Sequence, residues 1–127
     1  MYTPYADATY YSDEFQGNEI PIEELEKALK NASRHIDSLT YNRIVGKGFD
    51  NLTEFQQGII QEVCCHMAEF EYSNKDIIES VMQSYSINGV SMSFGNSWNI
   101  MIRSGIAVRK DIFKLLEQTG LCQGVVW

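Results

Sequence analysis

Apolar residues recur at helical spacing in two long stretches of the chain. Between residues 21 and 44 they follow one another every three or four positions, at Ile22, Leu25, Leu29, Ala32, Ile36 and Leu39. Residues 51–74 repeat the pattern with Phe55, Ile59, Val63, Met67 and Phe70. This spacing gathers the apolar side chains on one face of each helix. The sequence therefore predicts two long helices, joined by a short loop and packed as an antiparallel pair.

Local signals mark where these helices begin and end. Pro21 suits the first turn of a helix, and the glutamates that follow it suit the positively charged amino end. The first helix is expected to end near Ile44, before two glycines. Thr53 and Gln56 have the spacing of a capping box. A last helix is predicted over residues 108–119.

Residues 83–95, QSYSINGVSMSFG, alternate apolar and polar side chains around an Asn-Gly pair. Such a pair favours a two-residue turn between antiparallel strands. The predicted register pairs Ile87 with Val90, Ser86 with Ser91, Tyr85 with Met92, and Ser84 with Ser93. The predicted class is mostly α: a small helical bundle with two long antiparallel helices plus one protruding β-hairpin, in a single domain over residues 1–127.

The predicted hairpin has two open interpretations. It could fold onto its own helices, or it could reach a neighbouring copy, because an isolated hairpin is marginally stable in water. The candidate interface residues on it are Tyr85, Ile87, Val90, Met92 and Phe94. The candidate channel-lining residues are the four serines, Ser84, Ser86, Ser91 and Ser93. We also expect the apolar tail, about residues 121–127, to dock on a partner through Leu121, Val125, Val126 and Trp127.

Composition narrows the class of protein. The formal charge is −7, from 17 acidic and 10 basic residues, whereas a sequence-reading nucleic-acid binder needs a basic face. Three cysteines make an odd number and do not form a disulfide framework, which fits a reducing compartment. Neither a signal peptide nor an apolar run of membrane-spanning length is expected, so the predicted origin is cytosolic.

The strongest chemical candidate is CCHMAE, which brings Cys64, Cys65, His66 and Glu69 together in sequence. A structural zinc site needs four convergent ligands, and neighbours on a helix point in different directions. We therefore expect Cys64 in the core and His66 on a polar edge, with no metal and no cofactor. Glu69 and Glu71 form either a carboxylate pair or, as we favour, part of a solvated acidic face. No arrangement predicts an enzyme.

The order of these parts resembles the head–tail connector, or head-completion adaptor, proteins of long-tailed double-stranded DNA bacteriophages. The likeness lies in ASRHIDSLTYNRI, EFQQGIIQEVCCHMAEF, SYSINGVSMSFG and LLEQTGLCQGV, which together span most of residues 21–125. The resemblance implies a virion protein made in the host cytoplasm, which forms a dodecameric ring under the portal protein and extends the DNA channel. Its implied partners are further copies of itself, the portal, a stopper or tail-completion protein, and double-stranded DNA in passage without sequence-specific binding. No membrane partner is implied.

Two further expectations concern an ion pair between subunits and an alternative function. Asp37, placed on the polar side of the first long helix, and Arg43 near its end could form an ion pair between subunits, although single surface pairs contribute only about 0–1 kcal/mol. The alternative function is a small acidic cytosolic module that binds or masks a basic partner.

Overall fold

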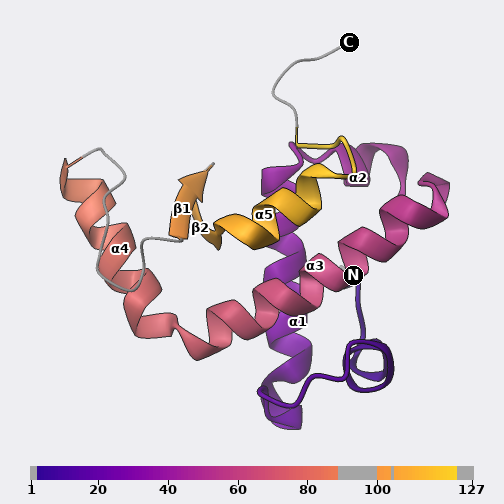
Figure 1. Cartoon of the computed structure of the whole chain (residues 1–127), viewed down its shortest axis with the longest axis horizontal. Coiled ribbons are helices and arrows are strands. Elements are labelled where there is room, and N and C mark those ends of the chain that lie inside the picture. The colour runs from indigo at the N-terminus through magenta and orange to yellow at the C-terminus, as the bar shows by residue number, and fades with distance from the viewer. Residues whose placement is uncertain (1–2, 89–99, 104, 123–127) are drawn as a thin grey trace.

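Two helices, α1 (Ile22–Leu39) and α3 (Glu54–Ser73), cross at the centre of the structure (Figure 1). The computed structural model describes residues 3–88, 100–103 and 105–122, and only the backbone of Val81 and residues 84–88. The chain reverses after α1, so that α3 returns across it. The prediction of a mostly α fold built on two long helices is confirmed.

Shorter elements surround this pair. In chain order they are η1 (Tyr10–Glu14), a π-helical turn, α2 (Arg43–Lys47), η2 (Phe49–Asn51), a 3-10 turn, α4 (Lys75–Asn88), β1 (Ile100–Arg103), β2 (Ile106–Arg109) and α5 (Lys110–Glu117). Figure 1 shows α5 lying against α3, while α4 turns away from the end of α3. The predicted capping box is present at the start of α3, with reciprocal hydrogen bonds between Thr53 and Gln56.

Small buried residues occupy the place where α1 and α3 cross. Ser33 of α1 meets Cys64 of α3, and both residues and the neighbouring Ala32 are completely buried. The Ser33 hydroxyl lies 3.2 Å from the Cys64 sulfur and donates to the Leu29 carbonyl at 2.8 Å. Because these side chains are short, the two backbones approach closely and the larger apolar side chains pack around them. The predicted core role of Cys64 is confirmed.

The first long helix ends earlier than predicted. Tyr41 and Asn42 both adopt positive φ angles, 56° and 58°, which a continuing right-handed helix excludes. The chain therefore breaks after Leu39, and Ile44 belongs to α2. The hydrophobic pattern of the sequence nevertheless continues to Ile44, because this residue is also buried in the core although it belongs to the next helix.

The β-hairpin exists, but the predicted position is wrong. Residues 84–88 are the helical end of α4, whereas the antiparallel strands are β1 and β2, paired with Arg103 opposite Ile106. Alternation over a few residues does not separate strand from helix, and Asn-Gly is also a common helix end. The turn residue Gly105 has a φ of 77°, a conformation that glycine adopts without strain. The predicted second strand, residues 90–94, lies outside the described residues.

The last helix begins two residues later than predicted, at Lys110. Val108 is completely buried and pairs with Met101 in the sheet, so β2 continues to Arg109. The side-chain amide of Gln56 donates to the Thr119 carbonyl at 2.9 Å, which fastens the end of α5 to the start of α3. The hairpin and α5 therefore form one unit packed on α3.

The buried crossing predicts a clear difference between two isoleucines of the same helix. Ile36 is completely buried, whereas Ile22 is 74% exposed. Ile36→Ala should lower the free energy of unfolding by about 2–5 kcal/mol, because it removes apolar contacts and leaves a cavity. Ile22→Ala, the matched control, should change it by about 0.5 kcal/mol or less. Urea denaturation measures both, and equal losses would contradict the packing described.

Candidate functional site

The predicted assembly residues fall into three groups. Ser84, Tyr85, Ser86 and Ile87 lie in the last turns of α4. Leu121 is only 5% exposed and belongs to the core of its own chain, so the expectation that it docks on a partner is wrong. The rest lie outside the described residues: Val90, Ser91, Met92, Ser93, Phe94, Val125, Val126 and Trp127.

Helical backbone changes what residues 84–87 can present. In a strand, Tyr85 and Ile87 share a face, but residues two apart on a helix point about 200° away from each other. The predicted separation of an apolar face from a serine face is therefore wrong for this half of the segment.

Helix α4 stands apart from the crossed pair of α1 and α3 (Figure 1). The chain bends at Asn74, whose φ of −125° departs from helical values and whose side-chain amide donates to the Phe70 carbonyl at 3.0 Å. Beyond the bend, α4 contacts the end of α3 and β2. Ile77 on this helix is 42% exposed. The structure thus presents an arm with an apolar residue on its surface.

A groove of about 520 Å³ lies between this arm and the body of the protein. Its walls come from α1, α3, α4 and the hairpin turn. Apolar side chains line it, among them Ala28, Tyr72, Ile78, Met82 and Ile106. Charged side chains of both signs stand at its edges: Glu24, Lys27, Lys75 and Glu79. Such a groove suits an apolar side chain or segment from a partner better than it suits a charged ligand.

A hydrogen-bonded pair of side chains joins α1 to α3 beside this groove. Nδ1 of His35 bonds the carboxylate of Glu71, and the His35 side chain is 40% exposed. This bond raises the pKa of His35 above its ordinary value, against the opposing effect of partial burial. Glu69, two residues earlier, instead accepts a bond of 2.7 Å from the Tyr11 hydroxyl. The two glutamates therefore serve separate contacts and do not form a carboxylate pair.

A second hollow, of about 450 Å³, lies between η1 and α3. Carboxylates line it together with aromatic rings: Glu14, Glu19, Glu62, Glu69, Tyr10, Phe15 and His66. The Phe15 and His66 rings meet edge to face at 4.8 Å. Gly17 passes so close to Tyr11 that a Cβ there would lie 2.4 Å from its ring. The hollow is acidic and is built on a tightly packed turn.

The cysteines are buried thiols. Cys64, Cys65 and Cys122 are free, and burial raises the pKa of Cys64 and of Cys122 to about 11. Protonated thiols are poor nucleophiles and poor metal ligands. Among the residues that the structure describes, no group of three His, Cys, Asp or Glu side chains is placed to hold a metal ion.

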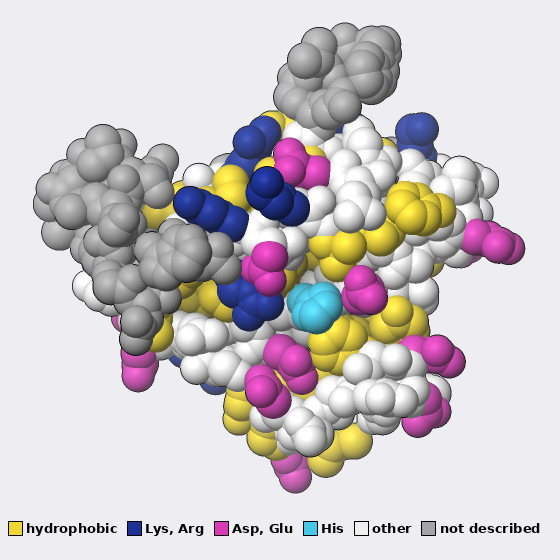
Figure 2. All heavy atoms as spheres, viewed as in Figure 1, with side chains coloured by type: hydrophobic (Ala, Val, Ile, Leu, Met, Phe, Trp, Pro, Cys, Tyr) yellow, Lys and Arg dark blue, Asp and Glu magenta, His cyan; other side chains and the backbone are white. Residues whose placement is uncertain are grey.

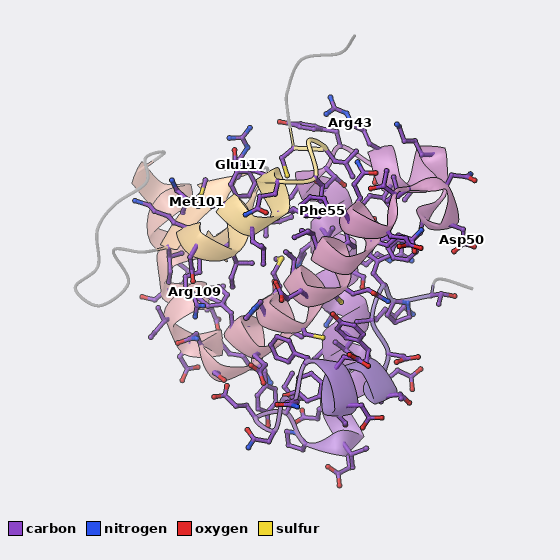
Figure 3. All side chains as sticks on the ribbon, turned by 45° about the vertical axis from the view of Figure 1, so that its right-hand side comes forward. Arg43, Asp50, Phe55, Met101, Arg109 and Glu117 are labelled. Carbon is purple, nitrogen blue, oxygen red and sulfur yellow. The ribbon has the colours of Figure 1, made fainter. Side chains whose placement is uncertain are left out.

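Asp37 and Arg43 also differ from expectation. Asp37 is 5% exposed, so its predicted place on the polar side of the helix is wrong, and it accepts a hydrogen bond from the Tyr5 hydroxyl. Arg43 donates to the Leu121 carbonyl at 3.1 Å, near the point where the described chain ends (Figure 3). Both residues therefore serve contacts within their own chain.

Comparisons with protein-family models, curated proteins and solved structures give no match to this chain. Within the described ranges, no helix is both long enough and apolar enough to cross a membrane.

The bond between His35 and Glu71 predicts a pH-dependent contribution to stability. Because the folded-state pKa of His35 is raised, its contribution is complete below about pH 6.5 and is lost as the pH rises through that raised value. The free energy of unfolding of the wild type relative to His35→Gln should therefore fall with rising pH. His66→Gln is the control, since that ring packs against Phe15. If urea titrations show that the difference in unfolding free energy between the wild type and His35→Gln grows with pH, the proposed effect of the His35–Glu71 bond is contradicted.

Proposed function

We propose that this protein is a structural subunit of a phage head–tail connector. Copies form a ring that docks under the portal protein, extends the DNA channel and links the capsid to the tail through a stopper or tail-completion protein. The proposal rests on the sequence resemblance and on one structural observation, the projecting arm α4 beside an apolar groove. Its place of action is the head–tail interface of the virion.

The arm and the groove are what a ring subunit needs. In a ring, one patch of each copy meets a different patch of the next, so every subunit carries both halves of the contact. Helix α4 supplies a protrusion with the exposed Ile77, and the groove offers apolar lining from Ile78, Met82 and Ile106. A monomer gains nothing from leaving this surface in water, whereas a neighbouring copy buries it.

The sequence of the arm's last turns and of the residues after them supports the same interpretation. Residues 83–99 contain no charged side chain, although 21% of the whole sequence is charged. The stretch includes Tyr85, Ile87, Met92, Phe94 and Trp98. A long uncharged stretch with aromatic residues is typical of surface that a partner covers, because protein interfaces are depleted of charge and enriched in aromatic residues at their centre.

The negative net charge of the protein is compatible with DNA passing through a ring of its copies. With a formal charge of −7 on each copy, a ring would repel phosphates on average. Double-stranded DNA would then pass without being held, since firm binding needs several lysine or arginine contacts to the backbone. The proposed contact with DNA is accordingly transient and independent of sequence.

The arm gives the proposal a direct test. Ile77→Asp should weaken assembly on the portal protein of the same genome by about 2 kcal/mol or more, roughly thirty-fold in affinity, because it places a charge in an apolar contact. Ile22→Asp, at an isoleucine that is 74% exposed on α1, is the matched control and should assemble normally. Negative-stain images and sedimentation velocity, each with purified portal, measure the outcome.

Two results would count against this function. A wild-type protein that stays monomeric at high concentration and also ignores the portal contradicts it. Binding instead to a basic protein, with an affinity that collapses as salt is added, would favour the acidic interaction module.

A further inference from the structure

Four of the ten lysines and arginines lie on the hairpin and α5. Residues 100–117 carry Arg103, Arg109, Lys110 and Lys114, with only Asp111 and Glu117 as carboxylates. Figure 2 shows dark blue side chains gathered in the region of the hairpin and α5, with a few magenta ones among them, whereas the lower and right-hand parts show mainly magenta side chains. The hairpin and α5 of this acidic protein thus carry a basic face, which we define by these four cations.

The contacts within this basic face leave an excess of positive charge. Arg109, at the edge of the hairpin (Figure 3), is paired with Asp111 by bonds of 2.7 and 3.0 Å. Arg103 is held with its guanidinium 5.1 Å from the centre of the Phe113 ring. Lys110 and Lys114 are exposed. Arg103, Lys110 and Lys114 therefore outnumber the one remaining carboxylate, Glu117.

The hollow between η1 and α3 has the opposite charge and a complementary chemistry. Within the described part of the chain, the carboxylates of Glu14 and Glu62 accept no hydrogen bond and form no ion pair. Burial raises the pKa of Tyr10, and the nearby Cys65, Glu62 and Glu14 raise it further. The Phe15 ring beside them suits the methylenes of a lysine or arginine whose charged end reaches the carboxylates.

These two faces lie on different parts of one molecule. Figure 1 places η1 at the lower right and the hairpin with α5 at the upper left, with the crossing of α1 and α3 between them. Because packed helices separate the two faces, a copy does not pair them with each other. A second copy can, and the contact then repeats from copy to copy in one direction, as rings require.

We propose that the basic face of one copy, led by Lys110 and Lys114, docks in the acidic hollow of the next copy at Glu14 and Glu62. The pairing rests on the proposed ring and specifies which surfaces meet in it. Complementary charge fixes orientation and speeds encounter more than it adds affinity, so it would select head-to-tail order while the arm buries apolar surface. A nucleic acid is the less suitable occupant, because this face carries only four cations and the chain as a whole is acidic.

Exchanging the charges tests the pairing. Variant one carries Lys110→Glu and Lys114→Glu, and variant two carries Glu14→Lys and Glu62→Lys. Each alone should need a roughly tenfold or higher concentration to assemble on the portal, since like charges then face each other. An equimolar mixture should assemble again, because each variant supplies the partner that the other lacks. Control substitutions Lys47→Glu and Glu23→Lys, at exposed sites of α2 and α1, should change little.

The outcomes separate this pairing from the ring itself. Rings that form normally from either variant, or mixtures that fail to recover, overturn the pairing and leave the ring standing. A wild type that never assembles overturns both. If circular dichroism shows that a variant is unfolded, the pairing is tested on the wild type instead. Its assembly on the portal should weaken as the salt concentration rises above about 0.15 M. Duplex DNA binding that variant one abolishes would instead assign the basic face to nucleic acid and overturn the pairing.

Discussion

The close approach of α1 and α3 at Ser33 and Cys64 determines where every other part of the protein lies. Both residues are completely buried, and the Ser33 hydroxyl also accepts a bond of 3.0 Å from the Tyr5 backbone amide, which holds the amino-terminal segment on α1. On the other side, α5 packs on α3 and carries the hairpin with it. A larger side chain at either position would separate the helices and move the walls of both hollows. The surfaces proposed for assembly thus depend on small residues far from them in sequence.

Much of the helical framework could be predicted from the sequence, because long amphipathic periodicity is a strong signal. The errors occur where local backbone conformation overrides that signal. Two consecutive residues with positive φ, Tyr41 and Asn42, end α1 without a glycine or proline to announce it. The sequence predicts the hairpin turn at Asn88, which is instead the last residue of α4, whereas the two four-residue strands lie on either side of Gly105. A four-residue strand lacks the length that periodicity needs.

The candidate surfaces were less predictable than the fold. The groove brings together Ala28, Tyr72 and Ile106, which come from three separate elements, so that no local motif reveals it. Asp37 looked like a surface charge from its helical position, yet the Tyr5 hydroxyl approaches it from a segment more than thirty residues away. By contrast, the basic face could have been found in the sequence as a local excess of cations in an acidic chain. The distribution of charge along the chain carries this information.

If the arm is the surface that a neighbouring copy covers, assembly must protect its backbone. Hydrogen–deuterium exchange of the free protein and of the portal-bound protein compares the two states residue by residue. Amides of α4 should exchange at least about tenfold more slowly after assembly, while those at the crossing of α1 and α3 should already be slow and should stay so. A portal-bound protein whose α4 exchanges as fast as in the free state would contradict the proposed role of this helix.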